Sequence, residues 1–181
     1  MRPMPKNAHA TDPSAAEQPA FSIERWSATS GSRRASRADL VITGAGRSWR
    51  AHATGNGAID ALLRAVDMAL APVLGTGVEL QTYNVHATGH GHDTQAAVTL
   101  SLRPREGDTH APAYPGRGLH DNVLEASVAA YVDAINRMVA HAEIDVAAAA
   151  PAPGATDRPD SEHDSETRRG HRDTLMGIYN E

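Results

Sequence analysis

Alternating hydrophobic and polar positions in the middle of the chain predict two β-strands. Along 94–102 the apolar side chains occupy the even-numbered positions, as in a half-buried strand with one solvated face. Along 78–86 the apolar phase shifts between Leu80 and Tyr83, which predicts a bulge or a strand covered on both faces. Weaker strand candidates, separated by glycine-rich turn sequences, are 21–28, 39–43 and 48–53.

Two further stretches have the apolar spacing of amphipathic helices. The first helix carries Ile59, Leu62, Leu63, Val66 and Leu70 on one face, and Pro72 with Gly75 closes it. The second runs from about Asp121 to about His141 and carries Leu124, Val128, Tyr131, Ile135 and Met138. Each helix has one apolar stripe, so each is expected to cover one side of a sheet.

A short repeat precedes both predicted helices. The pattern Gly-x-Gly-x-x-Asp begins at Gly55 and again at Gly116, a spacing of 61 residues (116 − 55). Both copies follow strand-like sequence, as expected of two similar units. The predicted fold class is α+β, with βββα units at 21–74 and 75–142, mostly antiparallel sheets and helices on one face.

The two ends of the chain differ in composition from the centre. Residues 1–20 and 143–181 are rich in Pro, Ala and charge and poor in large hydrophobic residues, which predicts disordered tails around a domain at 21–142. The final TLMGIYNE could be a short docking peptide or a frayed end. The N-terminal Met and the polar tails favour a complete chain.

Composition excludes several classes of protein. A chain of 181 residues cannot hold a catalytic (β/α)₈ barrel of about 250 residues. The net charge of −5 and the lack of a long basic run argue against nucleic-acid binding. There is no cysteine, no signal-peptide core and no apolar run of about 18 residues, so we expect a cytoplasmic protein that does not span a membrane.

The glycine-flanked start of the first helix has chemistry suited to a small carboxylate. A helix N-terminus offers free N–H donors and a partial positive charge, and Gly55 and Gly57 leave them unshielded. Asn56 tolerates a left-handed turn. Ile59 and Leu80 would surround an aliphatic side chain. The same pattern is also common as a simple turn and cap, and both readings stay open.

These motifs, in this order, resemble the C-terminal regulatory domain of α-isopropylmalate synthase, over roughly 21–142. The resemblance rests on G-N-G-x-x-D-A at 55–61, Tyr83-x-x-His86-Ala87, G-x-D at 91–93, and G-x-G-x-x-D-x-x-x-A-S at 116–127, followed by AYVDAINR. Two positions depart from the family pattern: Ala58 stands where proline is common, and Gln81-Thr82 replaces a more usual acidic residue.

The resemblance implies a pseudo-symmetric pair of βββα units that dimerises and binds leucine as a feedback inhibitor. It implies a ligand pocket formed by Gly55, Asn56, Gly57, Ile59, Leu80, Tyr83 and Ala87. We add the corresponding positions before the second helix, Gly116, Gly118, Asp121 and Val123. The family's enzymes also carry a catalytic barrel with a divalent metal, which this chain is too short to contain.

Other polar and aromatic residues give weaker indications of a functional site. His86, His90, His92 and Asp93 could ligate a metal, but a glycine-rich connection leaves their geometry unspecified, so no metal or cofactor is expected. Asp60 and Asp121 are interpreted as first-turn residues that favour the helix dipole, not as catalytic groups. Trp26 and Trp49 are expected in the core or at a dimer contact.

The sequence therefore predicts a stand-alone, homodimeric regulatory domain without catalysis of its own. It would bind leucine or a similar amino acid and act on a separately encoded synthase. The alternatives are a structural dimerisation relic without a ligand and, last, a histidine-based metal-dependent enzyme. The corresponding enzyme family, 2-isopropylmalate synthase, is an acyltransferase.

Overall fold

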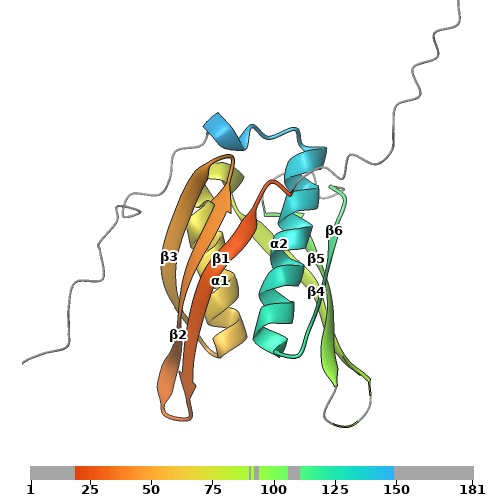
Figure 1. Cartoon of the computed structure of the whole chain (residues 1–181). Helices are drawn as coiled ribbons and strands as arrows, with labels where there is room; N and C mark the ends of the chain where they lie inside the picture. The colour runs from red at the N-terminus through yellow and green to blue at the C-terminus, as the bar shows by residue number, and fades with distance from the viewer. Residues whose placement is uncertain (1–18, 90, 92–93, 106–110, 149–181) are drawn as a thin grey trace, which may run out of the picture.

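The structure is a computed structural model that describes residues 19–89, 91, 94–105 and 111–148. Six strands form two separate antiparallel sheets, and each sheet carries one helix (Figure 1). Sheet A has the order β1-β2-β3 and sheet B the order β4-β5-β6. The strands are β1 Ser22–Gly31, β2 Arg34–Gly44, β3 Arg47–Gly55, β4 Val78–Thr88, β5 Gln95–Pro104 and β6 Tyr114–His120. The helices are α1 Ala58–Leu74, α2 Val123–His141 and the short 3₁₀ turn η2 Val146–Ala148.

Sheet A follows from alternation in its central strand. Ala38, Leu40 and Ile42 of β2 are buried against α1, whereas Arg37 and Asp39 point to the outer face. Trp49 of β3 lies in the same core and meets the ring of Phe21 edge to face, with centroids 5.5 Å apart. The expectation of a core position for Trp49 is confirmed. Trp26 of β1 is half-buried and donates its indole N–H to Glu125 of α2.

Sheet B confirms the two strands predicted from alternation. Val98, Leu100 and Leu102 of β5 are buried under α2. The pairing of β4 with β5 shifts its register between Leu80 and Thr82, which is the bulge indicated by the phase shift. The third strand, β6, was not recognised in the sequence.

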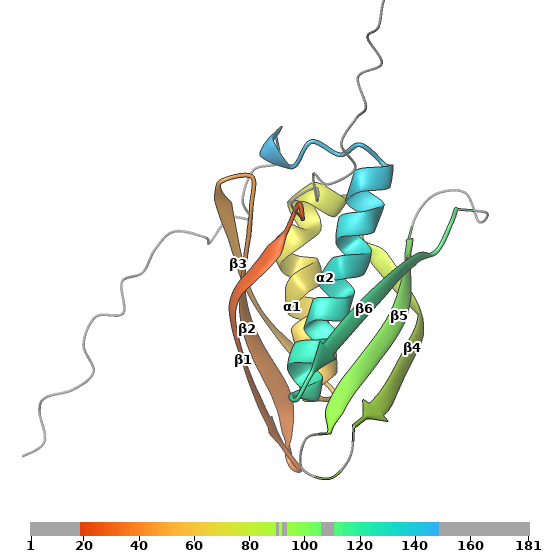
Figure 2. The same ribbon diagram turned by 45° about the vertical axis from the view of Figure 1, so that its right-hand side comes forward.

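The two helices lie side by side and run in the same direction, so both N-termini are at the end of the molecule that carries the β1–β2 turn (Figures 1 and 2). Helix α1 packs on β2 and β3, and α2 packs on β5 and β6. A row of small residues faces the sheet in each helix. These rows are Ala61, Ala65 and Ala69 in α1 and Ala126, Ala130 and Ala134 in α2, all fully buried.

The duplication is confirmed, but its spacing is 65 residues and not 61. Strand β3 ends at Gly55 and β6 at His120; the N-caps are Gly57 and Asn122. Each pair differs by 65 (120 − 55 and 122 − 57), as do the alanine rows. The glycine repeat of the sequence therefore does not align equivalent positions of the two units.

Gly116 and Gly118 lie inside β6, not at a helix N-terminus as predicted. A Cβ at Gly116 would come within 2.0 Å of the Ala130 carbonyl oxygen, and one at Gly118 within 2.0 Å of the Ala126 carbonyl oxygen. These glycines allow the backbone of β6 to approach α2 closely. Steric need at the strand–helix contact explains the pattern that resembled a second turn.

The predicted α+β class and the two βββα units are thus confirmed. Ile144 packs against the core and Val146 in η2 is buried, so packing continues past residue 142. Residues 1–18 and 149–181, which include most of the predicted tails and the TLMGIYNE peptide, lie outside the described residues. Within the described ranges, neither long helix has the length and hydropathy needed to cross a bilayer.

Candidate functional site

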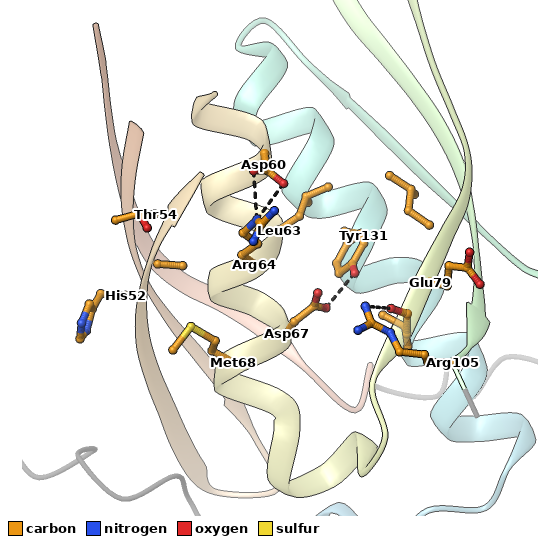
Figure 3. Close-up of a pocket in the computed structure, with 13 residues that line it drawn as sticks. His52, Thr54, Asp60, Leu63, Arg64, Asp67, Met68, Glu79, Arg105 and Tyr131 are labelled. Carbon is orange, nitrogen blue, oxygen red and sulfur yellow. Dashed lines mark hydrogen bonds and ion pairs between the residues drawn. The ribbon is translucent and has the colours of Figure 1, made fainter. Parts of the chain in front are cut away.

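An open groove of about 860 Å³ lies between the two units, along the solvent side of α1 (Figure 3). Strand β3 forms one wall, and β4 with Arg105 forms the other. Helix α1 and Tyr131 of α2 lie between them. The lining residues are His52, Ala53, Thr54, Asp60, Leu63, Arg64, Asp67, Met68, Val78, Glu79, Leu80, Arg105 and Tyr131. Of the residues predicted for the ligand site, Leu80 is in this lining.

The N-terminus of α1, here called the first mouth, comprises Gly55–Ile59. Its N-cap residue Gly57 provides no side chain, and the first backbone bond of the helix runs from Ala61 N–H to the Gly57 carbonyl and is 2.9 Å long. The mouth therefore keeps the electropositive character expected of an uncapped helix start. Within it, Asn56 is exposed.

The carboxylate of Asp60 contacts the first mouth. Its Oδ2 accepts the backbone N–H of Asn56 at 2.9 Å, and its Oδ1 accepts the Nε–H of Arg64 at 3.0 Å. The hydrogen bond from Asn56 holds the pKa of Asp60 below its usual value, with Arg64 acting in the same direction. Asp60 is thus in the first turn, as predicted. A Cβ at Gly55 would meet Ala61 N at 2.5 Å, so that glycine also serves close packing.

The N-terminus of α2 is different, because its own side chains occupy it. The Asn122 side chain accepts the backbone N–H of Leu124 at 2.9 Å and caps the helix. Asp121, predicted in the first turn, lies before this cap and accepts Gln95 Nε2 at 2.9 Å. Val123 is the first helical residue and is partly exposed. The equivalent termini therefore differ, and only the first mouth lacks a side-chain cap.

The inner face of β4 carries an apolar strip that α2 leaves partly uncovered. The strip consists of Leu80, Tyr83, Val85 and Ala87, which pair with inward-facing residues of β5. Leu80 is 40% exposed and Val85 43% exposed. The Tyr83 hydroxyl lies 2.6 Å from Ser127 Oγ of α2, which fixes the ring at the edge of the strip. Three predicted site residues thus share one face of β4.

A carboxylate and a phenol that the sequence analysis did not single out as a pair form the floor of the groove. Tyr131 Oη of α2 donates to Asp67 Oδ1 of α1 at 2.7 Å (Figure 3). Burial raises the pKa of Asp67 to about 6, although the Tyr131 hydrogen bond and the Arg105 charge act against the rise. Burial and the Asp67 carboxylate also raise the pKa of Tyr131. The sequence signal that could have identified Asp67 is its position as an acidic residue next to the buried apolar stripe of α1.

The histidine-based metal hypothesis receives no support from the described residues, which contain no cluster of three or more potential ligands. His86 is exposed on β4. His90, His92 and Asp93 lie outside the described residues.

Two copies of a βββα unit, each with its own sheet and joined through their helices, define a duplicated α+β domain with an open groove between its halves. The family model for the LeuA allosteric (dimerisation) domain matches residues 7–139. The chain belongs to this family.

Curated relatives with similar sequences are named 2-isopropylmalate synthase. The protein of Nitrosospira multiformis is 33% identical over 132 residues, 73% of this chain and 24% of the relative. That of Heliobacterium modesticaldum is 32% identical over 120 residues, 66% of this chain and 22% of the relative. That of Xylella fastidiosa is 37% identical over 91 residues, 50% of this chain and 16% of the relative. The chain thus spans at most about a quarter of the length of these relatives.

Proposed function

We propose that this domain is a non-catalytic regulatory module that binds a branched-chain amino acid, leucine foremost, at the first mouth. The relatives' name, 2-isopropylmalate synthase, supports a place in leucine biosynthesis. The observation that carries the proposal is the absence of a side-chain cap at Gly57, close to the groove that Leu63 and Leu80 line.

Each part of an amino acid has a suitable partner there. The ligand carboxylate would accept the free N–H groups at the start of α1, where the helix dipole favours an anion. Asp60 would attract the ammonium group, and Arg64 limits its repulsion of the ligand carboxylate. Leu63 and Leu80 would bury the aliphatic side chain. The capped N-terminus of α2 offers no equivalent arrangement.

We also propose that the domain homodimerises and acts on a catalytic synthase in the cytoplasm. The family's description as a dimerisation domain supports self-association. Binding of an amino acid beside the exposed apolar strip of β4 would couple ligand occupancy to the dimer if the strip is the dimer contact. A synthase barrel would then be either a separate chain or a part absent from this sequence.

Isothermal titration tests the ligand. We expect heat of binding with leucine, weaker binding with valine and none with glycine, because the apolar contact increases with side-chain size. Leu80→Ala should weaken leucine binding about 5- to 30-fold, the equivalent of about 1–2 kcal/mol of lost apolar burial. Leu119→Ala is the matched control, since Leu119 is 59% exposed on a different strand of sheet B.

Absence of heat with leucine, isoleucine and valine at millimolar concentration would contradict the ligand proposal. It would favour a domain that only dimerises. Equal loss of affinity in the Leu80 and Leu119 variants would contradict the location at the groove.

A further inference from the structure

The outer face of sheet A carries three exposed arginines in an otherwise acidic chain. Arg25 of β1, Arg37 of β2 and Arg50 of β3 are exposed there. Residues 22–55 contain six arginines and two carboxylates, a net charge of +4, whereas the whole chain has −5. Among the residues that the structure describes, no ion pair engages Arg25, Arg37 or Arg50. We call this surface the arginine face.

The centre of the arginine face is hollowed. Arg25, Val41 and Arg50 are direct pair partners across the three strands, so their side chains lie in one row on one face. A hollow of about 330 Å³ opens there, bounded also by Ser27 and Asp39. Val41 is only 6% exposed although it lies on the outer face, which indicates that the aliphatic stems of neighbouring side chains cover it. Two guanidinium groups therefore flank an apolar floor.

The chain itself contains an acidic segment of complementary charge. Residues 157–166 carry Asp157, Asp160, Glu162, Asp164 and Glu166 against one arginine, a net charge of −4. Spacings of two or three residues separate these carboxylates. An extended segment with this pattern repeats its carboxylates every ~7–10 Å, and next-nearest strands of a sheet are also ~10 Å apart.

The acidic segment also begins within reach of the arginine face. The last described element, η2, lies beside the β2–β3 turn in both views of the fold (Figures 1 and 2). Asp157 follows Ala148 by nine residue steps (157 − 148), which can span at most about 30 Å. A ten-residue strand such as β1 is about 33 Å long. A short connection also gives a high effective concentration of the segment at the face.

We propose that the segment 157–166 docks on the arginine face of its own chain, with carboxylates placed between Arg25 and Arg50. Single exposed ion pairs are weak, so docking depends on several pairs together and on ionic strength. The docked segment neutralises the positive charge of the arginine face. A second copy of the chain and an external polyanion are the competing occupants.

The absence of cysteine from the sequence permits a direct test in the full-length chain. A nitroxide label on Ser161→Cys should broaden the amide NMR signals of Arg25, Val41 and Arg50 at about 50 mM salt. The intensity of each signal should fall to less than about half of its value after the nitroxide is reduced. At about 0.5 M salt the broadening should disappear, because the Debye length falls to about 4 Å. The amide of Val98 in sheet B is the internal reference.

Paired variants test the charges. Arg25→Gln with Arg50→Gln should restore the signals of sheet A, whereas Arg117→Gln, an exposed arginine of β6, should leave the broadening unchanged. The amide spectrum of each variant reports whether it is folded. Broadening equal in sheets A and B, or insensitive to salt, would overturn the proposal.

A mixture of ¹⁵N chain without the nitroxide and ¹⁴N chain with the nitroxide distinguishes docking within one chain from docking between two chains. Broadening of sheet A in this mixture would overturn docking within one chain and assign the face to a second copy. No broadening in the mixture, together with broadening in the single labelled chain, is the expected result. A short DNA duplex tests the external polyanion. We expect it to release the segment from sheet A only at concentrations at which it also binds the arginine face of a chain without the segment, as in simple competition. Tight binding of the duplex to the intact chain would overturn the proposal.

Discussion

At the scale of single residues, the contact between Asp67 and Tyr131 joins the two units. Asp67 belongs to α1 and Tyr131 to α2, and their hydrogen bond of 2.7 Å lies on the floor of the groove. Phe21 and Asn136 make a second such link, in which the backbone of Phe21 both donates to and accepts from the Asn136 side chain. These polar contacts fix the position of one half relative to the other where apolar packing alone would allow sliding.

Asp67→Asn should change how stability depends on pH. Burial raises the pKa of Asp67 to about 6 in the folded state, above the value near 3.9 of an unfolded chain. The folded state therefore binds more protons between pH 4 and 6, and wild-type stability falls as the pH rises through this window. The asparagine variant lacks this loss. We expect its stability relative to wild type to improve by about 2–3 kcal/mol between pH 4 and pH 7.

Urea unfolding of both proteins at several pH values measures this difference. Asp133→Asn serves as the control, because Asp133 is a surface carboxylate of α2 that pairs with Arg137. A stability difference for Asp67→Asn that stays constant from pH 4 to 7 would show that the carboxylate is not buried in this way.

At the scale of elements, the contact of β6 with α2 depends on the absence of side chains. The carbonyl oxygens of Ala126 and Ala130 occupy the space that a Cβ at Gly118 or Gly116 would need. The fully buried alanines of α2 complete the close approach. A strand can lie this near a helix only where both surfaces are small.

Gly118→Ala should destabilise the domain by at least about 2–3 kcal/mol, because its Cβ would overlap backbone that cannot move without displacing α2. Gly31→Ala, where no atom lies within 4 Å of the added Cβ, should change stability by less than about 1 kcal/mol. Thermal unfolding followed by circular dichroism compares the two. Similar midpoints for both variants would argue against close packing of β6 on α2.

The elements show what sequence patterns can and cannot reveal. Alternation identified β5 and the bulge of β4, and the 3.6-residue period identified both helices, because burial of one face directly shapes those patterns. Strand β6 was not predicted from the sequence because it contains Pro115, Gly116 and Gly118, which are residues typical of turns. Only the three-dimensional contact with α2 explains why glycine is needed at these positions of β6.

At the scale of the whole molecule, the inner face of β4 is an apolar surface that the described residues leave partly without cover. Its strip reaches beyond α2, and Leu80 and Val85 are both at least 40% exposed. Strand β4 is also an edge of sheet B, and the free side of an edge strand can pair with another chain. Such a surface is typical of an interaction site.

Val85→Asp should shift the proposed homodimer toward monomer, because a carboxylate would be buried without a partner at the contact. Leu119→Asp changes a more exposed apolar residue of β6 and should leave the association unchanged. Sedimentation velocity at several concentrations measures both. If the wild type is monomeric throughout, or if Leu119→Asp alone dissociates it, the assignment of the β4 face is wrong.

The site was only partly predictable at this scale. The first mouth and Leu80 follow from local sequence, and Leu80 lines the groove together with Asp60 and Leu63 of α1. The Asp67–Tyr131 contact links residues 64 positions apart (131 − 67), and no local pattern records such a pairing. The cap at Asn122, which distinguishes the second N-terminus from the first, became visible only with the correct spacing of the two units.

The start of β1 and the end of α2 lie together at the end of the molecule where α1 passes into β4 (Figure 1). The connection between the units is a short turn, Gly75–Gly77. Joining the ends of the domain and opening the chain at that turn would preserve every strand pair of both sheets, since no ladder between the described strands crosses from one half to the other. Circular permutation should therefore be able to exchange the order of the two halves. The turn between them is a natural position for fission or fusion of this architecture.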